Sequence, residues 1–305
     1  MNTSFAVIIP VYNGGELYKQ LLASLPKQTL QPSCVLVMDS GSTDGSLEAS
    51  EAFGATVVRG TTSEFNHGGT RWRAVKHLPK PVEVVLYLTQ DAVPAHDEAF
   101  ERMIARFDEP RLGGCFGRQL PRMGAAPAEA FARNVNYSDS SYRVDYRGKS
   151  ARNFRDTLFS NSFSAYRVAA LEDINGFPED VILGEDVLAN VAMLEKGWIT
   201  EYVADAMVRH SHDYTLREEF RRYFDIGVMH RRAQDILGSY GRPTGKGKEY
   251  ALAEIKHMQP HGLMEAARSV LRSGAKLVAY KLGLMEHKLP LSFKRRISMH
   301  HRFWK

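Results

Sequence analysis

The first third of the chain alternates apolar runs with stretches of helical spacing. The apolar runs cover residues 5–11, 33–38, 55–59 and 82–88, and the helix-like stretches cover residues 16–25, 44–53, 68–78 and 97–107. Continuous apolar runs are typical of parallel strands buried on both faces, and their alternation with helices predicts an α/β fold with a mostly parallel sheet flanked by helices. Because ligands of such folds bind beyond the carboxyl ends of the strands, we expect the functional site there.

The pattern weakens after residue 117. Residues 118–160 are polar, with scattered aromatics and no clear period, which predicts an irregular segment over the site. Regular spacing returns with helices expected over 184–196 and 215–237 and a strand over 198–203. We therefore expect a catalytic unit over residues 1–237, with a donor half over 1–117 and an acceptor half over 118–237, and then a linker and helical tail over 238–305.

The composition and the N-terminal sequence indicate the cellular compartment in which the protein works. The chain has two cysteines, Cys34 and Cys115, too few for a disulfide framework, which favours a reducing environment. The N-terminus has a short apolar run without a basic flank, so no signal peptide is predicted. No run approaches the roughly 20 apolar residues that span a bilayer. These features predict a cytoplasmic protein.

Polar side chains follow three of the predicted strands. They are Asn13, Asp39 and Asp91. Each could be a turn or cap residue, because Asn and Asp side chains readily bond their own backbone. Three of them at one edge of a sheet favour a ligand site instead. Asp91 is also a poor cap for a helix that starts near residue 97, and its carboxylate suits a divalent cation such as Mg²⁺ or Mn²⁺ that bridges phosphate oxygens.

Four stretches of sequence resemble those of family 2 glycosyltransferases of the GT-A nucleotide-sugar-binding fold. They read VIIPVYNGG, VMDSGSTDGS, SEFNHGGTR and LTQDAVP, and the last two resemble bacterial rhamnosyltransferases in particular. The resemblance covers roughly residues 4–235 and implies a nucleotide-sugar donor, a divalent metal and inversion at the anomeric carbon. Two positions depart from the family pattern: the Asp-x-Asp metal motif is Gln90-Asp91-Ala92, and Trp72 stands where Asn is usual.

The resemblance implies a set of nucleotide-sugar-binding residues. Tyr12 or the adjacent proline would stack on the base, and Asp39 would accept the N3–H of uracil or thymine, which cytosine lacks. A helix that opens at Gly68-Gly69 would offer free N–H groups to the diphosphate, and Arg71 would add a guanidinium fork. The set comprises Pro10, Val11, Tyr12, Asn13, Asp39, Ser40, Phe65, Asn66, Gly68, Gly69, Arg71, Gln90 and Asp91.

Two acids stand in the first turn of the helix expected over 184–196. Glu185 and Asp186 could simply stabilise the positive end of that helix. The family pattern, GF followed by a spacer and ED, implies instead that the Asp is the general base, so we assign the base to Asp186, with Glu185 as the alternative. His210 and His212 lie two residues apart, hence on one face of an extended segment. Beside Asp91 they are candidate metal ligands, which favours Mn²⁺ over Mg²⁺.

The positive charge of the chain is concentrated in its tail. Residues 268–305 hold ten Lys or Arg and one acid, a net of +9, whereas the remainder has a net of −4. A nucleic-acid-binding core is therefore not expected. Apolar residues recur at helical spacing, and Phe293, Ile297, Phe303 and Trp304 stand among cations, which predicts an anchor on an anionic membrane surface. The alternative is a pair of helices that packs on the catalytic unit or on a second subunit of a homo-oligomer.

Together these features predict an inverting, metal-dependent glycosyltransferase. The expected reaction moves L-rhamnose from dTDP-β-L-rhamnose to a saccharide acceptor, lipid-linked, in the synthesis of a bacterial surface polysaccharide such as O-antigen. The expected location is the cytoplasmic face of the inner membrane. Two alternatives stay open: the same fold with a UDP-hexose or UDP-HexNAc donor, and a non-catalytic nucleotide-sugar-binding module, which the missing second Asp of the metal motif would allow.

Overall fold

The computed structural model describes residues 3–147, 152–241 and 246–305. Its strands form one mixed sheet in the order β3-β2-β1-β4-β8-β6-β9-β5, with β7 paired to β9. The first four strands in the chain are parallel, as the apolar runs predicted, and a mixed half follows them. The strands are β1 (Phe5–Val11), β2 (Val35–Asp39), β3 (Thr56–Arg59), β4 (Val84–Leu88), β5 (Val93–Pro94), β6 (Leu112–Leu120), β7 (Tyr142–Val144), β8 (Phe163–Arg167) and β9 (Ile199–Arg209).

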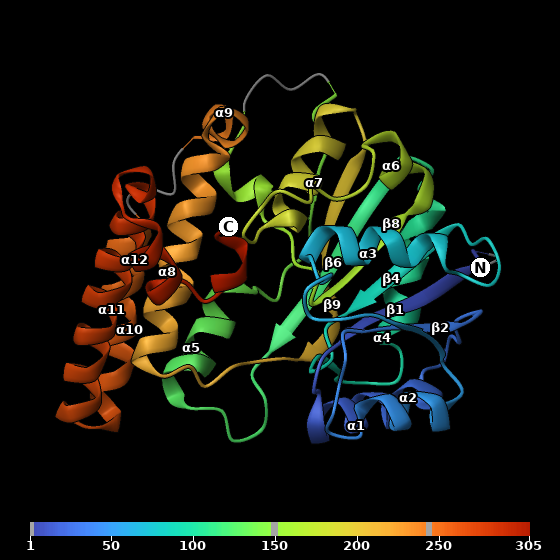
Figure 1. Ribbon diagram of the computed structural model, residues 1–305, viewed down its shortest axis with the longest axis horizontal. Coiled ribbons are helices and arrows are strands. Elements are labelled where there is room, and N and C mark those ends of the chain that lie inside the picture. The colour runs from blue at the N-terminus through green and yellow to red at the C-terminus, as the bar shows by residue number, and fades with distance from the viewer. Residues whose placement is uncertain (1–2, 148–151, 242–245) are drawn as a thin grey trace.

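Helices cover both faces of the sheet (Figure 1). On one face, α1 (Gly15–Ser24) and α4 (Ala99–Ile104) pack on β1 and β4 through Tyr18, Leu21 and Phe100, and α2 (Ser46–Phe53) lies beside α1. On the other face lie α3 (His67–Lys76), α6 (Val168–Asp173) and α7 (Glu185–Glu195). This two-faced cover leaves the carboxyl ends of the parallel strands facing a common edge, where the predicted residues lie.

The segment expected to be irregular contains regular structure. β6 extends to Leu120, and α5 (Pro127–Asn136) follows it before β7. The expectation of an irregular segment was therefore wrong here, although residues 148–151 lie outside the described residues. The sequence pattern is weak because α5 buries little: Phe131 is its buried residue, and its ring contacts Tyr250 and His257. Packing of this kind stabilises a short helix that its own sequence hardly specifies.

The tail packs on the long helix α8 (Leu216–Arg232), which ends before α9 (Gln234–Leu237) rather than running on to residue 237. The tail forms α10 (Lys246–Met258), α11 (Leu263–Leu284) and α12 (Leu291–Ile297). The backbones of α8 and α11 touch, because a Cβ added at Gly283 would lie 2.2 Å from the carbonyl oxygen of Phe224. Trp304 is buried beside Phe224. The packing alternative is thus confirmed, and Trp304 is not free to enter a bilayer.

Candidate active site

The polar side chains at the strand ends tie the surrounding loops together. Asn13 has a positive φ of 49°, and its Oδ1 accepts a hydrogen bond from the Thr43 N–H at 2.8 Å. The Asp39 carboxylate accepts bonds from the N–H groups of Gly41 at 2.9 Å and Ser42 at 3.1 Å. These are the turn-stabilising roles that single Asn and Asp residues commonly have. They leave the contact of Asp39 with a base as a prediction.

Gln90 joins the ends of β1 and β4. Its Oε1 accepts from the Tyr12 N–H at 2.7 Å and its Nε2 donates to the Tyr12 carbonyl at 3.1 Å. Gln90, the neighbour of the single carboxylate in the metal motif, therefore holds the loop that presents Tyr12. The Tyr12 ring is half exposed at this edge, with 47% of its surface accessible, so a flat base could stack on it.

Asp91, His210 and His212 form one group whose ligand atoms all lie within 4.8 Å of one another. The Asp91 carboxylate is 3.3 Å from Nε2 of His210 and 3.6 Å from Nδ1 of His212. β9 delivers both histidines, since they follow its last residue, Arg209. The structure thus brings Asp91 to two histidines that follow it by 119 and 121 positions in the sequence.

The surroundings of this group suit a metal. Nδ1 of His210 bonds to Oε1 of Gln119 at 2.8 Å, which orients the ring and leaves Nε2 toward Asp91. Burial lowers the pKa of His212 to about 4, so its imidazole is neutral at pH 7 and has a free lone pair, as metal binding requires. Burial alone would raise the pKa of Asp91, but the hydrogen bond and charge of His210 outweigh it and lower that pKa. A carboxylate with two imidazole rings fits a divalent cation that accepts both oxygen and nitrogen.

Glu185 and Asp186 have different surroundings. Glu185 is buried, and its Oε1 lies 3.0 Å from NH1 of Arg71, with Nδ2 of Asn161 at 3.2 Å. Burial would raise the pKa of Glu185, but the Arg71 charge outweighs it and lowers that pKa. Asp186 has no cation partner among the described residues; it accepts from the N–H groups of Asn161 at 3.0 Å and Val187 at 2.8 Å. Burial and then the charge of Glu185 raise the pKa of Asp186, which makes it the better proton acceptor of the two.

Asn161 organises this pair, and it was not among the predicted site residues. Its backbone N–H and its amide contact both acids, and its Oδ1 accepts from the hydroxyls of Ser164 at 3.0 Å and Tyr166 at 2.7 Å. All three residues lie at β8, in the central part of the sheet. No periodicity or local motif marks such a residue, because its partners are set by tertiary packing.

The residues at the start of α3 are bonded to or packed against other parts of the same chain. The Asn66 side chain caps the helix by accepting from the Gly69 N–H at 2.7 Å and donates to the Glu179 carbonyl at 2.6 Å. A Cβ at Gly68 would lie 2.3 Å from the Pro178 carbonyl, so the glycine permits close packing against that loop. Arg71 is buried and paired with Glu185. The groups expected to face the donor diphosphate thus have partners within the chain, while Phe65 is exposed.

Arg222 of α8 is a cation near His212. Its guanidinium carbon lies 5.7 Å from the centre of the Tyr214 ring, which in turn stacks on His212 at 5.0 Å. Arg222 makes no ion pair or hydrogen bond with any residue that the structure describes, and its charge lowers the pKa of both His212 and His300. The positive charge beside the Asp91–His210–His212 group is therefore free for an anion.

The end of the chain returns to this site. Met299 and His300 donate backbone N–H bonds to Oδ2 of the buried Asp225 at 2.9 and 3.0 Å. The His300 ring packs edge-on against His67, with 4.9 Å between ring centres. The C-terminal residues thus line the catalytic unit as well as packing on α8, as the position of the C-terminus at the centre of the molecule shows (Figure 1).

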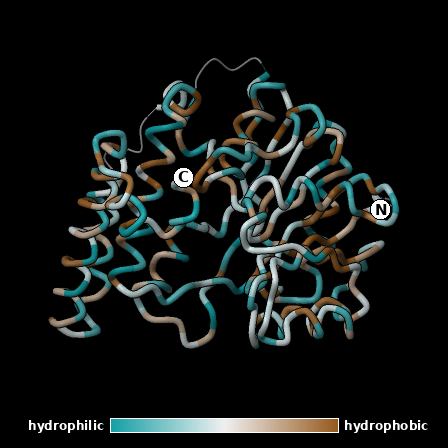
Figure 2. Tube along the Cα trace, viewed as in Figure 1, coloured by the Kyte–Doolittle hydropathy of each residue, from teal (hydrophilic) through white to brown (hydrophobic). Residues whose placement is uncertain are grey.

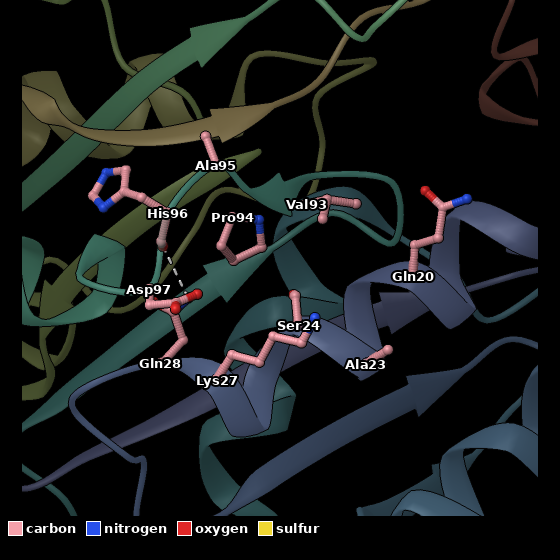
Figure 3. Close-up of a pocket in the computed structure, with 10 residues that line it drawn as sticks. All are labelled: Gln20, Ala23, Ser24, Lys27, Gln28, Val93, Pro94, Ala95, His96 and Asp97. Atoms are coloured by element: carbon pink, nitrogen blue, oxygen red, sulfur yellow. Dashed lines mark hydrogen bonds between the residues drawn. The ribbon is translucent and has the colours of Figure 1, made fainter.

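A separate hollow of about 350 Å³ lies between α1 and the segment after Asp91. Its polar lining comprises Gln20, Ser24, Lys27, Gln28, His96 and Asp97 (Figure 3). None of the predicted site residues lines it. It contains neither a pair of carboxylates nor His210 and His212. We therefore assign the chemistry to the site at the strand ends.

The sequence profile described as Glycosyl transferase family 2 matches residues 6–174. The chain belongs to this family. O-antigen chain rhamnosyltransferase RfbN of Salmonella typhimurium strain LT2 is 38% identical over 299 residues, which cover 98% of this chain and 95% of the relative. O-antigen chain rhamnosyltransferase WbaN of Salmonella anatum is 36% identical over 302 residues, which cover 99% and 96%. With such relatives over almost its whole length, this family 2 member is a glycosyltransferase.

Solved structures confirm the GT-A-like fold. The mannosyltransferase PcManGT from Pyrobaculum calidifontis, in complex with GDP-Man and Mn²⁺, has a TM-score of 0.61 at 19% identity, over 99% of this chain and 86% of that one. S. aureus TarS 1-349 in complex with UDP-GlcNAc has a TM-score of 0.52 at 17% identity, over 93% and 91%. At these identities the likeness shows the fold of this glycosyltransferase and no more.

Proposed function

We propose that the protein is an inverting rhamnosyltransferase that uses dTDP-β-L-rhamnose and a saccharide acceptor. The observation that carries the proposal is that one catalytic unit contains both a carboxylate without a cation partner among the described residues, Asp186, and the separate Asp91–His210–His212 group. The two relatives named O-antigen chain rhamnosyltransferases support the choice of sugar. A UDP-hexose donor is the alternative, because thymine and uracil present the same N3–H to Asp39.

Asp186 acts as the general base in this proposal. It takes the proton of the acceptor hydroxyl while the hydroxyl oxygen attacks the anomeric carbon from the face opposite the diphosphate. The new C–O bond forms as the bond to the phosphate oxygen breaks, which inverts the anomeric configuration and releases dTDP. Glu185 remains paired with Arg71, so one base serves the reaction and its neighbour keeps the pKa of that base raised.

Asp91, His210 and His212 would hold a divalent cation, and Mn²⁺ fits their mixed oxygen and nitrogen donors better than Mg²⁺. When bound, such an ion would offset the charge of the leaving diphosphate. The mannosyltransferase with the same fold was solved with Mn²⁺. Within the chain, Gln119 would orient His210 for this role.

Replacing Arg222 by Gln should raise the KM for the donor and lower kcat/KM by about 10–100-fold, since a charge-assisted contact to phosphate contributes roughly 1.5–3 kcal/mol. Steady-state kinetics with varied donor measures both effects. Arg217→Gln is the matched control, because Arg217 is exposed on the same helix. Unchanged kinetics in Arg222→Gln would remove Arg222 from the diphosphate site and return the role to Arg71.

The donor is tested by incubating the protein with a panel of nucleotide sugars and Mn²⁺ and measuring release of the nucleoside diphosphate. We expect dTDP-rhamnose to give the fastest release. Faster release from UDP-glucose, UDP-galactose or UDP-GlcNAc would establish the alternative donor, and no release from any sugar would favour the non-catalytic binding module. Anomer analysis of a transferred product by NMR would test inversion, with an α-L-rhamnoside expected.

We further propose that the acceptor is lipid-linked and that the enzyme meets it at an anionic membrane surface, in synthesis of a bacterial surface polysaccharide such as O-antigen. The names of the two relatives support the polysaccharide. The net charge of +9 on residues 268–305 supports the surface.

A further inference from the structure

One face of α11 is apolar and exposed. Its exposed members recur every three to four residues, which places them on one side of a helix. Leu263, Met264 and Leu271 have 87%, 69% and 61% of their surface accessible. We call this set the outer face of α11: Leu263, Met264, Ala267, Val270, Leu271, Gly274, Leu277 and Val278. Contiguous exposed apolar surface of this kind marks an interaction site.

The opposite side of α11 explains why this face points outward. Ala279 and Gly283 are buried against α8, and α10 packs along the helix as well. α11 therefore lies at the edge of the molecule, remote from α1 and α2 (Figure 1). Hydrophobic and hydrophilic residues alternate along these outer helices (Figure 2). The outer face is thus a surface that folding of this chain leaves uncovered.

α11 itself carries four cations and one acid: Arg268, Arg272, Lys276 and Lys281 against Glu265. Of the ten Lys and Arg in residues 268–305, four pair with acids: Arg268, Arg272, Lys276 and Lys294. The other six make no ion pair with any described residue: Lys281, Lys288, Arg295, Arg296, Arg302 and Lys305. Lys281 lies on the outer face itself, two turns after Gly274.

We propose that the outer face of α11 docks on an anionic lipid membrane. No helix among the described residues is long and apolar enough to cross a bilayer, so the helix would lie in the interface with its apolar side inserted and its cations at the headgroups. A second copy of the chain is a poorer partner, since it would bring two strongly positive tails together. The inference deepens the proposed function, which supplies a lipid-linked acceptor.

The structure also corrects the prediction of which residues insert into the membrane. Trp304 is buried, and Ile297 and Phe303 pack partly against the cluster of α8, whereas Phe293 is exposed. The sequence had placed all four in the bilayer. Leucine, valine and methionine of α11 replace the buried aromatics as the inserting groups, so mutation of the outer face should weaken docking without disturbing the core.

Co-sedimentation of the full chain with vesicles tests the proposal. Wild-type protein should sediment with vesicles of phosphatidylglycerol and phosphatidylcholine far more than with phosphatidylcholine alone, and binding should weaken but persist as salt rises. The double variant Leu271→Glu/Val278→Glu should bind the anionic vesicles at least about tenfold more weakly, because it places carboxylates on the inserting side of the helix. Gln20→Glu/Ala52→Glu adds the same charge on exposed positions of α1 and α2 and should bind like the wild type.

Thermal melting checks that both double variants fold, and sedimentation velocity reports their oligomeric state. Equal binding of wild type and Leu271→Glu/Val278→Glu would overturn the proposal, as would binding of wild type to both vesicle types alike or to neither. A wild-type dimer that this variant dissociates, without vesicle binding, would assign the face to a second copy instead. Because vesicle binding needs no turnover, its outcome is independent of the donor test.

Discussion

Replacing Asp186 by Asn is expected to slow glycosyl transfer by about 10²–10⁴-fold while donor affinity stays nearly unchanged, because a general base typically contributes that much. The asparagine keeps the size of the side chain but cannot take a proton at neutral pH. One of its two polar atoms would be an NH₂ group facing the N–H of Asn161 or Val187, which now donate to the carboxylate. A thermal melt must therefore accompany the kinetics.

The pH profile gives this prediction a second readout. Burial and the charge of Glu185 raise the pKa of Asp186, and the base works only when deprotonated. Transfer should consequently fall with decreasing pH through a value above the ~4 that is ordinary for Asp. Asp180→Asn removes an exposed carboxylate from the preceding loop and should leave both the rate and the profile unchanged.

The variant Glu185→Gln distinguishes the role of Glu185 from that of Asp186. It removes the charge that pairs with the buried Arg71, so it should destabilise the fold, and breaking a buried ion pair typically costs about 3–5 kcal/mol. If Glu185→Gln folds but is inactive while Asp186→Asn is active, Glu185 is the base. If Asp186→Asn loses nucleotide binding alone, Asp186 belongs to the donor side of the site.

The positions and carboxyl ends of the parallel strands were predictable because local sequence patterns determine them. Apolar runs marked β1, β2 and β4, and Asn13, Asp39 and Asp91 stand at their ends as expected. Motif spacing likewise placed Glu185 and Asp186 at the start of α7. Such features depend on a few consecutive residues, whose burial and turn chemistry can be read directly from the chain.

The partners of those residues were less predictable. Arg71 looked like a phosphate ligand beside the glycines of α3, but it pairs with Glu185, 114 positions later. Nothing near either residue records that contact. The buried Trp304 is similar: an aromatic among cations at the end of a chain predicts a membrane surface, and only the position of Phe224 on α8 shows that it has a protein partner.

Replacing Asp91 by Ala should lower the transfer rate on the order of 10³-fold or more, since a bound cation contributes several kcal/mol of stabilisation to developing phosphate charge. Asp91 is the one carboxylate in the group with His210 and His212. Its loss leaves only the two imidazole rings, which bind Mn²⁺ far less well without an oxygen ligand. The effect should be larger on Mn²⁺-dependent binding than on the fold, because the ionic contacts of Asp91 are those with the two other proposed metal ligands, His210 and His212.

Calorimetric titration with dTDP, with and without Mn²⁺, separates a ligand from a turn residue. Mn²⁺ should tighten dTDP binding to the wild type and leave binding to Asp91→Ala unchanged. Asp97→Ala is the control, because Asp97 is an exposed carboxylate of the same segment that lines the separate hollow; it should respond to Mn²⁺ like the wild type. Wild-type turnover by Asp91→Ala would contradict the metal site. Gln90 and Asp91 would then serve only to shape the loop after β4, and Arg222 would be left as the cation that faces the leaving diphosphate.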